Sequence, residues 1–128
     1  MIIQLVQQWF NKAEADLVTV KILLKDPEHN TGIVCFHCQQ AVEKYLKGYL
    51  SAKNIEFPKT HDLITLYDLC IKTDKDFQLL DKYKLTTLTY YSVENRYPDE
   101  QYTPTAQETE EFTLLAKQTK EFVLKKVK

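Results

Sequence analysis

The chain has 128 residues, the size of one domain, and its 44% hydrophobic content is enough to bury one core. Its 17 basic and 18 acidic side chains nearly cancel, which excludes nucleic-acid binding by bulk positive charge but leaves a local basic patch open. The two glycines, Gly32 and Gly48, are far apart, so a glycine-rich phosphate loop is excluded and a turn-rich β-fold is not expected.

The first half of the chain has the apolar spacing of two long helices. Apolar residues recur every three or four positions over 2–24, and Pro27 ends this first helix because proline cannot continue the backbone hydrogen bonds. Asn30 or Thr31 is a suitable N-cap for a second helix, which fades at 53–54.

A short third helix is expected from Leu63, with Thr60 or Asp62 as its cap, and a break follows at 73–76. This helix carries the apolar residues Leu63, Leu66, Leu69 and Cys70.

The second half of the chain ends in two further helices. The fourth should end near Arg96 or Tyr97, because the residue before Pro98 avoids helical angles. The last begins at the capping box Thr105–Glu108. These elements predict an all-α, up-and-down bundle of four to five helices in a single domain, 1–128. The residues expected to be mostly buried are Trp9, Leu17, Val34, Cys38, Ala41, Tyr45, Leu66, Leu85, Leu88, Phe112, Leu115 and Phe122.

Location and redox state follow from what the sequence lacks. No apolar run approaches the roughly 18–20 residues that a membrane span needs. The first residues have no basic region or cleavage site of a secretory signal, and three cysteines form no disulfide framework. A cytoplasmic protein with reduced thiols and no membrane partner is expected.

The residues Cys35, His37 and Cys38 first suggest a metal site. No second ligand pair follows at the spacing of a structural zinc site, so small buried thiols are the preferred interpretation, and no metal or cofactor is expected. His37 lies at the edge of the apolar stripe and is expected to make one hydrogen bond. Glu43 and Lys47, four residues apart, are expected to form a surface ion pair.

Arg96 is the only arginine in the chain. Its planar guanidinium is suited to a bidentate contact with a phosphate or carboxylate. The alternative is an internal ion pair with Glu94, Asp99 or a residue of another helix, and the sequence does not decide between the two.

Four segments together resemble the HEPN domain family (higher eukaryotes and prokaryotes nucleotide-binding). Residues 9–17 resemble its first helix, and residues 35–47 resemble its second-helix signature, a His-x-x-x-Ala-x-Glu-Lys-x-x-Lys type of run. Residues 58–63 resemble the following turn, and residues 92–98 resemble an Arg-Tyr-Pro motif. The resemblance implies an all-α bundle that forms a homodimer and pairs with a minimal nucleotidyltransferase, in toxin–antitoxin fashion.

Many members of this family are metal-independent ribonucleases with an Arg-x(4–6)-His motif, in which the arginine holds phosphate and the histidine moves a proton. Here Gln101, Tyr102 and Thr103 occupy the three positions of that histidine. The resemblance therefore favours a module that binds a nucleotide or RNA phosphate, or a nucleotidyltransferase, over an enzyme. The alternatives are a weak ribonuclease that uses Arg96 with His37 or His61, and a structural homodimer without ligand.

The candidate nucleotide- or RNA-binding residues combine the second-helix signature with the Arg96 segment. If a nucleotidyltransferase partner exists, the resemblance makes Tyr102 the candidate acceptor of a nucleotidyl group. The full set is Arg96, Tyr97, Asp99, Tyr102, His37, Glu43 and Lys47.

Overall fold

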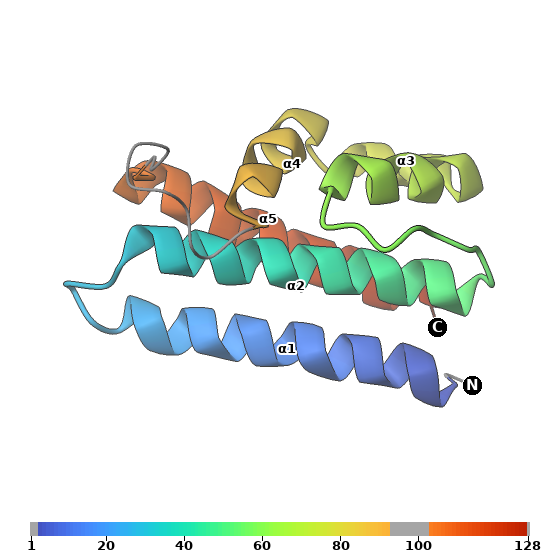
Figure 1. Ribbon diagram of the computed structural model, residues 1–128, viewed down its shortest axis with the longest axis horizontal. Coiled ribbons are helices and arrows are strands. Elements are labelled where there is room, and N and C mark those ends of the chain that lie inside the picture. Colours follow the sequence, from blue (N-terminus) through green and yellow to red (C-terminus); the bar gives the residue numbers. More distant parts are fainter. Residues whose placement is uncertain (1–2, 93–102, 128) are drawn as a thin grey trace.

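A computed structural model describes residues 3–92 and 103–127 of the chain. Within these residues the protein is all-α and contains no strand, as predicted (Figure 1). The described residues form five α-helices and two short 3₁₀ helices: α1 (Gln4–Leu24), α2 (Thr31–Ala52), α3 (Leu63–Thr73), η1 (Lys75–Leu79), α4 (Lys82–Thr89), η2 (Tyr90–Ser92) and α5 (Ala106–Val127).

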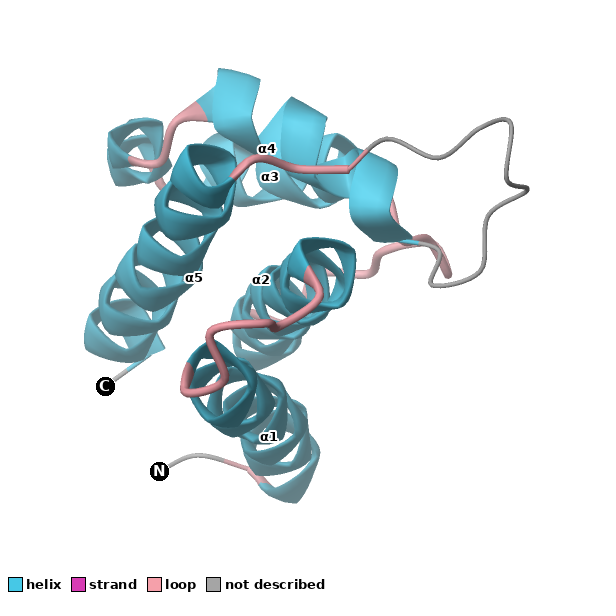
Figure 2. Ribbon diagram, turned by 90° about the vertical axis from the view of Figure 1, so that its left-hand side faces the viewer, coloured by secondary structure: helices cyan, strands magenta, loops and turns pink. Residues whose placement is uncertain are grey.

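Helix α2 is the central element of the bundle. Helix α1 packs antiparallel along one side of it, α5 lies along a second side, and α3 and α4 cover a third (Figures 1 and 2). Helix α5 runs in the same direction as α2, because the chain between them returns to the end of the bundle at which α2 begins (Figure 1). Neighbours on three sides leave α2 with little surface of its own.

Side-chain caps fix where the helices begin. Asn30 Oδ1 accepts a hydrogen bond from the backbone N–H of Ile33 at 3.0 Å, and Asp62 Oδ1 accepts one from Ile64 at 3.1 Å. The capping box is confirmed in both directions: the Glu108 N–H donates to Thr105 Oγ1, and the Thr105 N–H donates to Glu108 Oε1, each at 3.0 Å.

The fourth helix is shorter than predicted. Its α-helical part ends at Thr89, and a 3₁₀ turn continues to Ser92, whereas the sequence pointed to an end near Arg96 or Tyr97. Thr86 and Thr87 direct their hydroxyls back to carbonyls four residues earlier, and β-branched residues of this kind weaken a helix. The predicted end itself lies outside the described residues.

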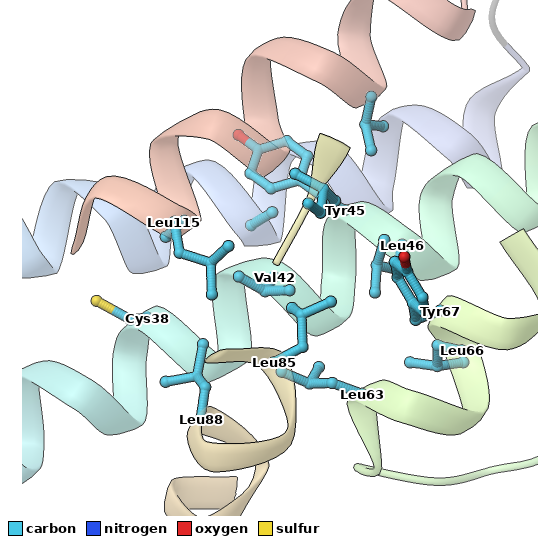
Figure 3. Close-up of a cluster of buried hydrophobic side chains, with 14 of the residues drawn as sticks. Cys38, Val42, Tyr45, Leu46, Leu63, Leu66, Tyr67, Leu85, Leu88 and Leu115 are labelled. Atoms are coloured by element: carbon cyan, nitrogen blue, oxygen red, sulfur yellow. The ribbon is translucent and has the colours of Figure 1, made fainter. Parts of the chain in front are cut away.

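The hydrophobic core forms where α2 meets the other helices (Figure 3). Of the predicted core residues, nine are fully buried: Val34, Cys38, Ala41, Tyr45, Leu66, Leu85, Leu88, Phe112 and Leu115. Trp9, Leu17 and Phe122 are partly buried at its edge. On α1 the neighbouring Phe10 is more deeply buried than Trp9.

Helices α1 and α2 approach closely at Gly48. A Cβ atom at this position would lie 2.4 Å from Cε1 of Phe10, so only glycine fits against that ring. This approach brings the polar residues of α1 within reach of α2. No helix of the described residues is both long and apolar enough to cross a membrane.

Candidate functional site

Two groups of charged side chains lie on α2, and each joins α2 to a different neighbour. The first, here called the Asp16 cluster, contains Asp16 of α1 with His37 and Lys44 of α2. His37 Nδ1 donates to Asp16 Oδ1 at 2.9 Å, and Lys44 Nζ donates to Asp16 Oδ2 at 2.6 Å. His37 and Lys44 are seven residues apart, which places them on one face of the helix. The cluster attaches α1 to α2.

The second group, here called the Glu43 cluster, contains Gln39, Glu43 and Lys47 of α2 with His61, two residues before α3. Glu43 Oε1 accepts from His61 Nδ1 at 2.9 Å and from Gln39 Nε2 at 3.2 Å. Glu43 Oε2 accepts from Lys47 Nζ at 2.9 Å. Gln39 Nε2 also donates to the His61 carbonyl oxygen at 2.9 Å. Both carboxylate oxygens of Glu43 are therefore occupied within the protein.

The prediction of a surface ion pair between Glu43 and Lys47 is wrong, because both side chains are buried. Glu43 is 4% exposed and Lys47 is 8% exposed. The nitrogen of Lys47 also lies 5.5 Å from the centre of the Trp9 ring. The cause is the central place of α2, whose side opposite the apolar stripe is covered by α1 and by the segment that leads into α3.

The two histidines differ in how much of the ring reaches solvent. The side chain of His37 is 23% exposed and makes the one hydrogen bond predicted for it. The side chain of His61 is 64% exposed although its Nδ1 is bonded to a buried carboxylate. Its Nε2 makes no hydrogen bond with the described residues. The ring is thus held through Nδ1 by a buried carboxylate, while most of the side chain is exposed to solvent.

His61 lies next to the end of α4. The backbone N–H of Leu63 donates to Thr89 Oγ1 at 3.0 Å, which ties the start of α3 to the last residue of α4. The 3₁₀ turn η2 follows, and its Tyr91 ring packs against Phe112 of α5 with 6.0 Å between ring centres. The chain directly before residues 93–102 is therefore fixed to the bundle.

Four of the predicted site residues belong to that segment. Arg96, Tyr97, Asp99 and Tyr102 lie outside the described residues. Among the described ones, the structure places His37 in the Asp16 cluster and brings Glu43 and Lys47 together in the Glu43 cluster.

A surface hollow adjoins this region. Its volume is about 470 Å³, and its described lining is Thr86, Thr87, Tyr90 and Tyr91. This volume is within the range of small-molecule pockets. The hollow lies where α4 passes into η2, directly before the segment that contains Arg96.

The cysteines are buried, as predicted. Burial raises the pKa of Cys35 to about 12 and that of Cys38 to about 11, so both thiols stay uncharged near neutral pH. Their sulfur atoms contact the hydroxyls of Thr109 and Thr113 of α5 at 3.9 and 3.8 Å. They act as small packing groups between α2 and α5.

Sequence reasoning missed Asp16 and Gln39 as partners in these clusters. Asp16 carries a readable signal, since it falls between Ala13 and Val20 at helical spacing and so belongs to the buried face of α1. Gln39 carries the same signal, since it falls between Cys35 and Val42 at helical spacing.

Comparison with known proteins agrees with this architecture. The family model described as the HEPN domain matches residues 6–127, so the chain belongs to the HEPN domain family. It is also similar to a solved structure described as ST0689, an archaeal HEPN homologue. That likeness has a TM-score of 0.71 and 25% sequence identity, and it covers 96% of this chain and 98% of that one. Among curated proteins, none matches.

Proposed function

We propose that this HEPN chain is a binding module that takes the phosphate of a nucleotide or RNA at Arg96 and docks with a minimal nucleotidyltransferase. The observation that carries the proposal is the membership of the HEPN family together with the single arginine of the chain in its Arg-Tyr-Pro motif. A guanidinium can donate two parallel hydrogen bonds to one phosphate, which lysine cannot do.

The surroundings of the segment support a binding role. On one side of it Thr89 is bonded to Leu63 of α3, and on the other side the Thr105–Glu108 capping box starts α5. The hollow lined by Tyr90 and Tyr91 adjoins its start, and aromatic rings are common stacking partners for bases. Of the two rings Tyr90 is the accessible one, with 39% of the residue exposed.

The test replaces Arg96 by lysine, which keeps the charge and removes the two-fold donor. Binding of adenosine monophosphate and of a short RNA, measured by calorimetry, should weaken by about 1–3 kcal/mol in Arg96→Lys, with an unchanged melting temperature. Arg96→Gln removes the charge as well and should weaken binding further, and Lys72→Gln is its control, because Lys72 is an exposed cation of α3. A lower melting temperature with unchanged binding would identify Arg96 as an internal ion-pair residue.

The same samples separate a binding module from a ribonuclease. RNA incubated with the protein in EDTA should stay intact. Cleavage that is lost in Arg96→Lys would favour the metal-independent ribonuclease that uses Arg96 with His37 or His61. An unaltered RNA and no binding of either ligand would favour a structural module.

The nucleotidyltransferase part of the proposal is tested by co-expression with such an enzyme. We expect the intact mass of this chain to rise by one or more nucleotidyl groups, and the gain should be absent in Tyr102→Phe. An unmodified chain in the presence of an active partner removes Tyr102 as the acceptor.

The proposed module acts as a homodimer. Large apolar side chains stay exposed on the single chain, among them Ile22, Leu79, Tyr83 and Leu114. Light scattering at micromolar concentration should give twice the 15.1 kDa mass of the chain. A mass of one chain contradicts this part.

A further inference from the structure

We infer that His61 is a phosphate-binding residue, with the Glu43 cluster as the device that orients it. The inference deepens the proposed function and rests on it for the class of ligand, a phosphate group of a nucleotide or RNA. It adds a donor that lies in another part of the sequence from Arg96. The donor is the Nε2–H group of the His61 ring in its protonated form.

The geometry of the ring supports this role. Glu43 holds Nδ1 from the buried side at 2.9 Å, and Gln39 holds the backbone of the same residue through its carbonyl oxygen, also at 2.9 Å. The ring therefore loses little freedom when it binds a ligand, and preorganised donors bind more tightly than mobile ones. With 64% of the side chain exposed, a ligand can reach Nε2 without movement of the bundle.

The charges of the cluster favour an anion. The negative charge of Glu43 is balanced by Lys47, whose nitrogen lies 2.9 Å from Oε2. A proton on His61 therefore gives the cluster a net charge of +1, and the outward edge of the ring carries an N–H donor. The carboxylate next to it in the sequence, Asp62, is already engaged by the Ile64 N–H at 3.1 Å and the Thr65 hydroxyl at 2.9 Å.

The chain beside His61 is joined to the end of α4. Leu63, two residues on, is bonded to Thr89 at the end of α4, and η2 then leads into the segment of Arg96. His37, by contrast, makes its bond to Asp16 between α1 and α2, with only 23% of its side chain exposed.

The experiment observes the ring nitrogens of the three histidines by long-range ¹H–¹⁵N NMR on the full chain, with signals assigned from single His→Gln variants. The first probe is dimethyl phosphate, because its single charge is the same at pH 6 and pH 8. We expect the Nε2 signal of His61 to shift in a saturable way as this probe is added at pH 6, because a protonated ring donates from Nε2 to the phosphate. His29, whose Nδ1 is bonded to the Asp26 carbonyl oxygen, should not respond.

Binding measurements extend the test to the two sources of phosphate. Adenosine monophosphate and a dinucleoside monophosphate represent a nucleotide and an RNA linkage. His61→Gln should weaken the preferred one about tenfold at pH 6, the loss expected for one charge-assisted hydrogen bond, and His29→Gln should leave it unchanged. Should His61→Gln fail to fold, the NMR shift of the unaltered chain decides alone.

Glu43 is a positioning residue in this scheme, and the tautomer of His61 reports on it. The ¹⁵N shifts of the neutral ring should show a proton on Nδ1, and this preference should weaken in folded Glu43→Gln. A His61 ring without a preferred tautomer in the unaltered chain would contradict the orienting role.

The outcomes separate this inference from the proposed function. If Arg96→Lys weakens binding while the His61 signals stay still, the inference is wrong and the Arg96 proposal stands. If the His61 signals respond and Arg96→Lys binds normally, the inference stands and the Arg96 site is wrong. A His61 shift that chloride at equal ionic strength reproduces would overturn the inference as well.

Discussion

The Asp16 cluster and the Glu43 cluster contain the same three charged groups, a carboxylate that holds one histidine through Nδ1 and one lysine. They differ in what surrounds them. In the Asp16 cluster every member is partly shielded between α1 and α2. In the Glu43 cluster the carboxylate and the lysine are buried, whereas the histidine is mostly exposed. A carboxylate that holds a histidine and a lysine is therefore compatible with a shielded histidine in one cluster and a mostly exposed one in the other.

The comparison also explains the polar residues of the second-helix signature. His37 and Lys44 face α1, and Glu43 and Lys47 face the segment before α3. Each of these side chains has a partner inside the protein. The polar pattern of this helix is therefore accounted for by its neighbours.

The largest difference between the clusters is expected when each carboxylate becomes an amide. Glu43→Gln leaves the buried Lys47 without its counter-charge and should lower the free energy of unfolding by about 3 kcal/mol. Asp16→Asn leaves Lys44 and His37, which water reaches more easily, and should cost about 1 kcal/mol. Urea unfolding at pH 7 measures the loss in the free energy of unfolding for each variant. Equal losses would show that burial does not distinguish the two clusters.

Much of this fold could be predicted from the sequence, because its signals are local. The repeat of apolar residues, the Asn30 and Asp62 caps and the Thr105–Glu108 capping box each depend on residues within a few positions. The end of α4 was harder, since Thr89 has a tertiary partner in Leu63. Propensity does not reveal that bond.

The candidate site was less predictable, because its contacts join residues that are far apart in the sequence. Glu43 and Lys47 read as a solvent-exposed pair because spacing alone does not show that α2 is surrounded by other helices. The partners Asp16 and His61 are 28 residues from Lys44 and 18 residues from Glu43, respectively. Contacts at such separations follow from packing, which a single sequence does not show.

A smaller contrast is expected from the lysines. Lys47→Met removes the counter-charge of a buried carboxylate that keeps His61 and Gln39 as donors, and it should cost about 2 kcal/mol. Lys44→Met should cost less than about 1 kcal/mol, because Asp16 is nearer to solvent and keeps His37. Methionine preserves the length of the side chain, so the contact of residue 47 with Trp9 is largely retained. Thermal unfolding followed by circular dichroism shows which variant loses more stability. A larger loss of stability in Lys44→Met than in Lys47→Met contradicts the comparison.

The smallest difference between the clusters is expected from the histidines. His37 should matter more for stability, whereas His61 should matter more for ligand binding. His37→Gln should cost about 1 kcal/mol, since it disturbs a shielded bond between two helices. His61→Gln should cost about 0.5 kcal/mol or less, because most of its ring is already in water. Unfolding in urea measures both variants, and phosphate binding is measured on the same samples.

Cysteine labelling locates the loss in His61→Gln. Cys70 of α3 and Cys35 of α2 are both fully buried, and burial raises the pKa of each to about 12, so each reacts only when its helix opens. If His61 served only to attach the start of α3, its replacement should speed the labelling of Cys70 severalfold relative to Cys35. We expect that ratio to change by less than about twofold while phosphate binding falls, because Leu63 remains bonded to Thr89 and still holds α3 in place. A large rise in the ratio with unchanged phosphate binding would show that His61, like His37, only attaches neighbouring elements to each other.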